Sequence, residues 1–257
     1  MIDIHCHALS GVDDGAETFE ASVAMCQIAA ADGITHLVAA PHCNYGYRFD
    51  PPLCRSKIAE LQAAVGDVPK LFLGCDFHLS YDSIRQLLEK PAEFTINQTG
   101  YLLAELSDQF IPEQLGRVIY DIQVAGLTLI ITHPERNAVF RRKPELLYEW
   151  VMRGCLLQVT AQSYTGGFGS RAQRLAEQLL ERNLIHLFAS DAHDPKHRPP
   201  ILSRCYQKVA EEKGADVADR LLKDNPRAII DGLPLSPGPP PVGPKPGKRG
   251  WFSFLKR

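Results

Sequence analysis

The sequence has neither a long apolar run nor an excess of charge of one sign. No segment approaches the roughly 20 consecutive apolar residues that a membrane-spanning helix needs, so we expect no transmembrane helix. The net charge is −2, which gives no overall basic field to attract nucleic acid. The first residues, MIDIHCHALSGVDDG, contain no basic region followed by an apolar core, so we expect no signal peptide.

Paired cysteines are also missing from the sequence. Its seven cysteines are an odd number, and no two are spaced as CxxC. Both facts argue against a disulfide framework and against a zinc site built from thiolates. The cysteine content therefore predicts a protein of the reducing cytoplasm.

What the sequence does contain is a series of short apolar runs. The chain of 257 residues is 45% hydrophobic and 23% charged, values that suit a globular protein with a sizeable core. Near-continuous apolar runs are typical of parallel strands covered on both faces. We predict seven such strands, at residues 2–6, 36–40, 70–75, 101–106, 128–132, 155–159 and 185–190.

Helical apolar spacing fills several intervals between these runs. We predict helices at residues 17–33, 51–66, 112–126, 144–154 and 170–183. Seven strands that alternate with helices predict an α/β fold, a distorted (β/α)7 TIM-like barrel. A doubly wound open sheet is the alternative architecture.

Proline and glycine dominate the sequence after Gly232. We therefore predict a folded domain at residues 1–232, followed from residue 233 by a Pro/Gly-rich linker that is extended or disordered. The chain ends in a basic and aromatic tip, residues 247–257. Such a tip can bind weakly to an anionic membrane surface or to a partner, which would place the protein at the inner face of the membrane.

Histidines and carboxylates gather where the predicted strands end. Six of the seven strands have such a side chain at or just after the carboxyl end, where barrel and open α/β folds carry their active sites. Burying these groups together without a cation would be costly, and divalent metals remove that cost. The candidate ligands are His5, His7, Asp14, His42, Asp76, Glu105, His133, Asp191 and His193.

The number and type of these ligands indicate which metals could bind. One zinc ion takes about four ligands, so nine predict two or three ions with bridging carboxylates. A mixture of imidazole and carboxylate ligands suits manganese, iron or zinc. Asp13 and His78 are the next candidates for ligands.

Two arginines lie in the same predicted loops. Arg136 follows His133 in HPER, and Arg198 follows His193 in DAHDPKHRPP. Arginine matches phosphate oxygens in geometry and charge. We therefore predict that both arginines bind a phosphoryl group and that the chain is a phosphohydrolase.

The ordered motifs MIDIHCH, VDDG, APH, LLAEL, HPER and SDAH followed by RPP resemble the polymerase-and-histidinol-phosphatase (PHP) superfamily. The likeness runs from Met1 to about Gly232 and is greatest to the bacterial capsule-type protein-tyrosine phosphatases. It implies a PHP-type barrel with three metal ions, usually manganese, held by the nine residues above, and phosphate binding by Arg136 and Arg198. It also implies hydrolysis of phosphotyrosine on a bacterial tyrosine kinase that regulates capsule or exopolysaccharide synthesis.

One position departs from the family pattern. The family usually has glutamate where this chain has Asp76, and aspartate is one methylene shorter, so the bridge between two ions is expected to differ. Two alternative functions remain open at this point. One is a PHP phosphoesterase acting on a small molecule such as histidinol phosphate, and the other is an adaptor with weak or lost catalysis.

Overall fold

The computed structural model describes residues 1–79, 81–111 and 114–244. Within these residues the strands are short, and every strand pairing is parallel. Their bounds are β1 Ile2–Cys6, β2 His36–Ala39, β3 His42–Cys43, β4 Lys70–Leu73, β5 Asp76–His78, β6 Tyr101–Glu105, β7 Thr128–Thr132, β8 Leu156–Thr160 and β9 Leu187–Ala189.

The strands form a barrel of seven positions, two of which hold an interrupted strand. One sheet has the order β1-β2-β4, and the other has the order β3-β5-β6-β7-β8-β9. Ala40 and Pro41 separate β2 from β3, and Gly74 and Cys75 separate β4 from β5. A Cβ atom on Gly74 would lie 2.8 Å from Val38 Cγ1. Only glycine therefore allows the segment between β4 and β5 to approach β2 this closely.

Hydrogen bonds between β1 and the residues after β9 close the barrel. The N–H of Asp191 donates to the carbonyl of His5, and the N–H of His7 donates to the carbonyl of Ala192, both at 2.8 Å. The buried carboxylate of Asp3 also accepts from the N–H of Ser190 at 3.0 Å. The predicted distorted barrel is therefore confirmed, and the open sheet is not found. The difference from the prediction is that strands 36–40 and 70–75 end early and resume as β3 and β5.

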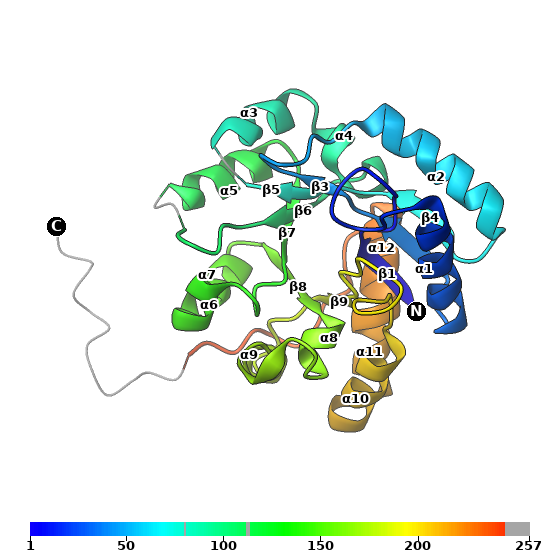
Figure 1. The fold of residues 1–257 in the computed structure, drawn as a ribbon. Coiled ribbons are helices and arrows are strands. Elements are labelled where there is room, and N and C mark those ends of the chain that lie inside the picture. Colours follow the sequence, from blue (N-terminus) through cyan, green and yellow to red (C-terminus); the bar gives the residue numbers. More distant parts are fainter. Residues whose placement is uncertain (80, 112–113, 245–257) are drawn as a thin grey trace.

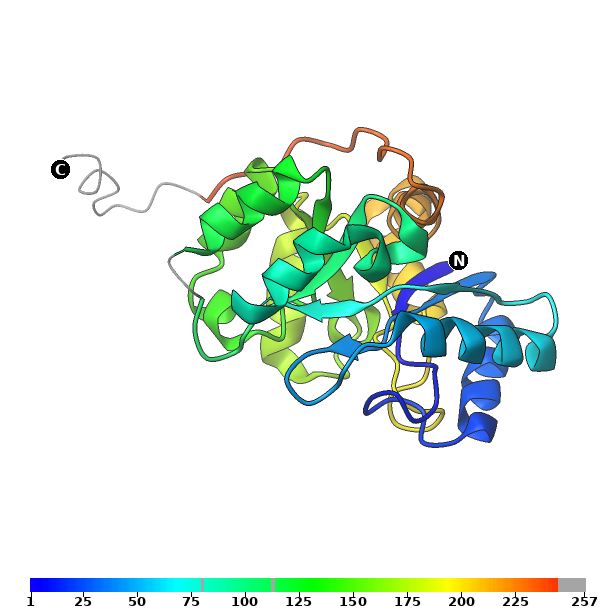
Figure 2. The same ribbon diagram turned by 90° about the horizontal axis from the view of Figure 1, so that it is seen from above.

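Helices surround the barrel (Figures 1 and 2). The helical segments are α1 Phe19–Ala31, α2 Pro51–Val65, α3 Tyr81–Glu89, α4 Pro91–Phe94, η1 Ile96–Gln98, α5 Leu115–Val124, α6 Ala138–Arg142, α7 Glu145–Met152, α8 Ala161–Tyr164, α9 Gly169–Glu181, α10 Ser203–Lys213, α11 Ala215–Asp219, η2 Arg220–Asp224 and α12 Asn225–Asp231. The five predicted helices correspond to α1, α2, α5, α7 and α9, each somewhat shorter than expected.

Local side chains explain why α1 and α2 begin where they do. The hydroxyl of Thr18 accepts from the N–H of Ala21 at 3.2 Å, and the carboxylate of Asp50 accepts from the N–H of Leu53 at 3.1 Å. Each of these side chains satisfies an amide that the first turn of a helix leaves without a partner.

Two apolar clusters hold the barrel together. The larger cluster lies between the strands and the surrounding helices. The smaller cluster draws on β1, β2, β6, β7 and β9 and includes Ile229 and Ile230 of α12 together with Ile96 of η1. Since α12 and η1 pack against each other and against β1 and β6 respectively, they cover the end of the barrel opposite to the carboxyl ends of the strands.

The segment after α12 is extended and lies against the folded body. The hydroxyl of Tyr101 donates to the carbonyl of Leu233 at 2.7 Å. Further along, the N–H of Val242 donates to the carbonyl of Arg182 at 2.8 Å, and the Nε of Arg182 donates to the carbonyl of Val242 at 2.9 Å. Residues 233–244 are thus extended and bound to the folded body, and we call them the strap. The tip at 247–257 lies outside the described residues, and the domain boundary at Gly232 stays a prediction.

Candidate metal centre

All nine predicted ligands lie at the carboxyl end of the barrel. His5 belongs to β1, His42 to β3, Asp76 to β5 and Glu105 to β6. The others lie in the segments that follow β1, β7 and β9: His7 and Asp14, His133, and Asp191 and His193. The strand order of the barrel therefore brings together side chains that are up to 188 positions apart in the chain, from His5 to His193.

Seven of these nine residues form three overlapping groups. Within each group the candidate ligand atoms lie within 4.8 Å of one another. The groups are His7, Asp14, His42 and His193; His5, His7 and Asp76; and His42, Asp76 and Glu105. Because His7, His42 and Asp76 each belong to two groups, the arrangement has the form of adjacent cation sites with shared ligands.

Asp76 shows most directly that this donor set fits cations. Its side chain is fully buried, and its Oδ2 lies 3.1 Å from His42 Nδ1 and 3.6 Å from His5 Nε2. Among the described residues neither Oδ2 nor His42 Nδ1 has a hydrogen-bond partner. Burial raises the pKa of Asp76, but the surrounding histidines outweigh burial and hold that pKa well below its usual range. A buried carboxylate oxygen and a buried imidazole nitrogen that lack hydrogen bonds are costly, and a shared cation would satisfy both atoms.

Asp191 and His133 lie beside the three groups. Asp191 Oδ1 is 3.4 Å from His7 Nε2 and 3.6 Å from His5 Nε2, whereas His133 Nε2 is 3.8 Å from Glu105 Oε1. The backbone is left-handed at both residues, with φ of 34° at His133 and 51° at Asp191. Non-glycine residues in this region carry backbone strain, which is often found at functional sites.

The loop after β1 distinguishes Asp13 from Asp14. Asp13 Oδ2 accepts from His7 Nδ1 at 2.7 Å and from the N–H of His42 at 3.0 Å, and its Oδ1 accepts from the N–H of Gly15. Its oxygens are therefore engaged, and Asp13 orients His7. Asp14 lies within reach of His42 and His193. A Cβ atom on Gly15 would lie 2.2 Å from the carbonyl oxygen of His7, so this turn requires glycine.

The strand without a predicted ligand contributes a residue that the sequence reasoning missed. Gln158 of β8 is fully buried, and its Oε1 lies 2.8 Å from His5 Nδ1. A proton on Nδ1 directed at this oxygen leaves Nε2 free to bind a metal. His193 is held similarly, because its Nδ1 lies 3.0 Å from the carbonyl oxygen of Asp191.

The two predicted phosphate-binding arginines lie together at the edge of the candidate metal centre. Both bind Asp191 Oδ2, Arg198 with its Nη2 at 2.8 Å and Arg136 with its Nη1. The ring of Phe168 packs against both guanidinium groups, at 4.7 Å from Arg136 and 5.5 Å from Arg198. Arg198 Nε is buried and has no hydrogen-bond partner among the described residues. This part of the site thus places two positively charged groups beside the candidate metal ligands, where an anion could bind.

The charges in the site make metal binding depend on the protonation of its histidines. Burial disfavours protonated His7, but hydrogen bonds to the carboxylates of Asp13 and Asp191 outweigh burial and raise the pKa of His7 to about 10. Burial and the neighbouring His7 lower the pKa of His193 to about 3. Since only neutral imidazole binds a metal, binding at His7 must displace a proton.

Two further histidines and Cys6 have other surroundings. His78 Nδ1 lies 3.7 Å from Glu105 Oε2, and His78 is in none of the three groups. His186 Nδ1 accepts from the N–H of Leu157 at 3.1 Å. Cys6 is buried in the larger apolar cluster, and burial raises the pKa of its thiol. These three residues are not members of the groups that could hold a cation.

Comparison with known proteins agrees with this geometry. The family described as "Capsular polysaccharide synthesis, CpsB/CapC" matches residues 1–231. The chain belongs to the CpsB/CapC family. It is 33% identical to the tyrosine-protein phosphatase YwqE of Bacillus subtilis over 243 residues, which cover 93% of this chain and 95% of that protein. It is 31% identical to the tyrosine-protein phosphatase CpsB of Streptococcus pneumoniae over 242 residues, covering 90% and 98% of the two chains.

A solved structure extends the comparison with the CpsB/CapC family to three dimensions. One chain from the crystal structures of YwqE from Bacillus subtilis and CpsB from Streptococcus pneumoniae, described as unique metal-dependent tyrosine phosphatases, matches with a TM-score of 0.89. The identity is 32%, and the match covers 95% of this chain and 100% of that chain. The resemblance that the motifs indicated is therefore confirmed.

Proposed function

We propose that this chain is a metal-dependent protein-tyrosine phosphatase that acts on a bacterial tyrosine kinase regulating capsule or exopolysaccharide synthesis. One observation carries the proposal: a pair of arginines that both contact Asp191 lies directly beside three overlapping groups of candidate metal ligands. The named activity of the CpsB/CapC relatives supports the same conclusion.

We propose that His5, His7, Asp14, His42, Asp76, Glu105, His133, Asp191 and His193 hold two or three divalent ions. Manganese is the metal we expect, and iron and zinc are also compatible with imidazole and carboxylate donors. When bound, such ions supply positive charge to a phosphoryl group and lower the pKa of water toward neutrality.

The chain's own residues then orient the substrate. Arg136 and Arg198 hold the phosphoryl oxygens and stabilise the charge that develops on them. The ring of Phe168 keeps both guanidinium groups in place, so little reorganisation is needed during reaction. The leaving group is a phenol with a pKa of about 10, which needs less help from a general acid than an aliphatic alkoxide. Glu135 accepts from the N–H of Thr160 at 3.2 Å and so anchors the loop that carries Arg136.

A cysteine nucleophile has no place in this proposal. Cys6, the cysteine between the two N-terminal histidines, packs in the core, and all seven cysteines are free thiols. Free thiols are also consistent with a cytoplasmic location, which we propose. No helix in the described part of the chain is long and apolar enough to cross a membrane.

Substrate comparison tests this function against its alternatives. We expect the manganese-loaded protein to hydrolyse a phosphotyrosine peptide with a much higher kcat/KM than histidinol phosphate. A preference for histidinol phosphate would instead support the small-molecule phosphoesterase. Failure to bind metal and to hydrolyse either compound would support the adaptor function.

A further inference from the structure

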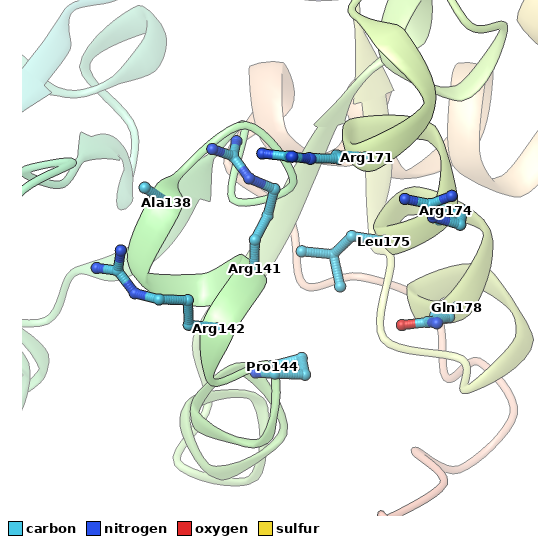
Figure 3. A pocket seen from close by; sticks show the side chains of 8 residues that line it. All are labelled: Ala138, Arg141, Arg142, Pro144, Arg171, Arg174, Leu175 and Gln178. Atoms are coloured by element: carbon cyan, nitrogen blue, oxygen red, sulfur yellow. The ribbon is translucent and has the colours of Figure 1, made fainter.

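A pocket lined by four arginines lies between α6, the start of α7 and α9. It encloses about 450 Å³, and its arginines are Arg141, Arg142, Arg171 and Arg174. Figure 3 shows Arg141 and Arg171 extending toward one another from opposite walls, with Leu175 between the walls. All four arginines are exposed, so a ligand can reach them from solvent.

The positive charge of this pocket is not neutralised within the described chain. No carboxylate there lies within 4.0 Å of the guanidinium groups of Arg142, Arg171 or Arg174. The guanidinium group of Arg141 donates to the carbonyl oxygen of Arg136. Clustered like charges repel one another and raise the local concentration of anions. The pocket therefore favours an anionic ligand.

The pocket lies next to the phosphoryl-binding edge of the candidate metal centre, because Arg141 in its lining donates to the carbonyl oxygen of Arg136. α6 begins at Ala138, two residues after Arg136, and α9 begins at Gly169, next to Phe168. Arg136 and Phe168 are the residues that meet at the phosphoryl-binding edge. A peptide whose phosphotyrosine occupies that edge can therefore extend between α6 and α9.

The lining indicates which anionic side chain fits. Leu175, Pro144 and Ala138 provide apolar surface between the arginines. An aryl phosphate combines a flat apolar ring with an anionic group that arginine binds through two parallel hydrogen bonds. A carboxylate on a short aliphatic side chain would leave the apolar part of the pocket unfilled.

We propose that this pocket binds a second phosphotyrosine of the same peptide, so that the enzyme favours multiply phosphorylated substrates. The inference rests on the proposed phosphatase function and assigns that site a substrate preference. The pocket contributes to binding of the peptide and not to the chemical step. Loss of the pocket should consequently raise the KM of doubly phosphorylated peptides and leave their kcat unchanged.

Steady-state kinetics with paired peptides tests this preference. One peptide carries a single phosphotyrosine. A second set of peptides carries another phosphotyrosine about two to six residues away, and a third set carries glutamate at the same positions. This range of spacings allows for the reach of an extended chain. We expect the doubly phosphorylated peptide to have a KM about tenfold lower, the scale of one additional charged hydrogen bond between arginine and phosphate. The double variant Arg171→Ala/Arg174→Ala should abolish this advantage and leave hydrolysis of the single phosphotyrosine unchanged.

Two further variants serve as controls. Arg171→Lys/Arg174→Lys keeps the charge but loses the planar fork, so it should retain only part of the advantage. Arg227→Ala removes an exposed arginine from α12, at the opposite end of the barrel, and should retain the full advantage.

The results that overturn the inference are distinct from failure of the proposed function. An equal KM for singly and doubly phosphorylated peptides at every spacing would overturn it, as would an equal advantage for glutamate. A uniform loss of turnover on all substrates in the alanine variant would show a structural role instead. If the wild type hydrolysed neither peptide, the proposed function would fail. Fluorescence anisotropy with the same peptides would then still show whether the alanine variant loses affinity for the second phosphotyrosine.

Discussion

Replacing Gln158 tests whether the metal centre depends on the strand that supplies no ligand. Gln158 Oε1 lies 2.8 Å from His5 Nδ1, and both side chains are fully buried. Gln158→Leu keeps a similar volume and removes this acceptor. The proton on Nδ1 then loses its partner, at a cost of about 1–3 kcal/mol, or moves to Nε2, where it blocks metal binding.

We expect Gln158→Leu to weaken metal affinity by about 10- to 100-fold, the usual effect of losing a group that orients a ligand. This range corresponds to about 1.4–2.7 kcal/mol. The Nε2 of Gln158 has no partner among the described residues, so its removal breaks no second hydrogen bond there.

Phosphatase activity of metal-stripped protein, titrated with manganese, measures this affinity. Saturating manganese should restore most of the wild-type kcat. Gln158→Glu, which keeps an acceptor for His5 Nδ1, is the matched control and should bind metal at least as well as Gln158→Leu does. An apparent metal affinity in Gln158→Leu equal to that of the wild type would refute the argument that this hydrogen bond orients His5.

Four further predictions concern other parts of the chain. Asp14→Asn should nearly abolish hydrolysis even in excess manganese, whereas excess manganese should restore hydrolysis in Asp13→Asn. If hydrolysis by the two variants depended on manganese concentration in the same way, the separate roles of Asp13 and Asp14 would be contradicted. Arg198→Ala should lower kcat/KM for phosphotyrosine by about 100-fold at unchanged metal content, and loss of metal would indicate a structural role. Burial lowers the pKa of His186 to about 4, so the stability linked to its neutral form is present above its unfolded pKa of about 6.5 and is lost as pH falls toward 4. Wild-type protein should lose about 2 kcal/mol from this group between about pH 7 and pH 5, and urea unfolding of His186→Asn should show a smaller loss. Full-length protein should float with anionic vesicles at low salt more than a chain ending at Pro244 does, and equal recovery would exclude a membrane role for the tip.

The sequence predicted the barrel and the location of the site because both follow from simple regularities. Apolar runs such as TLIIT and CLLQV identify parallel strands, and the carboxyl ends of such strands meet at one end of a barrel. His5, His133 and Asp191 could therefore be placed together without coordinates. The role of Asp13 as the hydrogen-bond acceptor of His7 could not, because an aspartate in a loop can point in several directions.

Other parts of the fold had weaker signals. The breaks between β2 and β3 and between β4 and β5 depend on close packing at Gly74, which sequence spacing does not show. The strap at 233–244 is rich in proline, and composition predicts its lack of regular structure but not its contacts with the body. Gln158 did have a signal, because it is the polar residue within the apolar run CLLQV. Phe168 had none, since an aromatic residue in GGFGS fits an ordinary loop equally well.

Hydrolysis of a phosphotyrosine peptide by metal-stripped protein, before and after each metal is restored, tests the central claim most directly. We expect no turnover without metal, recovery with manganese at two or three ions per chain, and no recovery in Asp191→Ala or His193→Ala. Iodoacetamide should not inactivate the restored enzyme. Turnover that survives metal removal, or that is abolished by alkylation of a cysteine, would contradict a metal-dependent phosphatase.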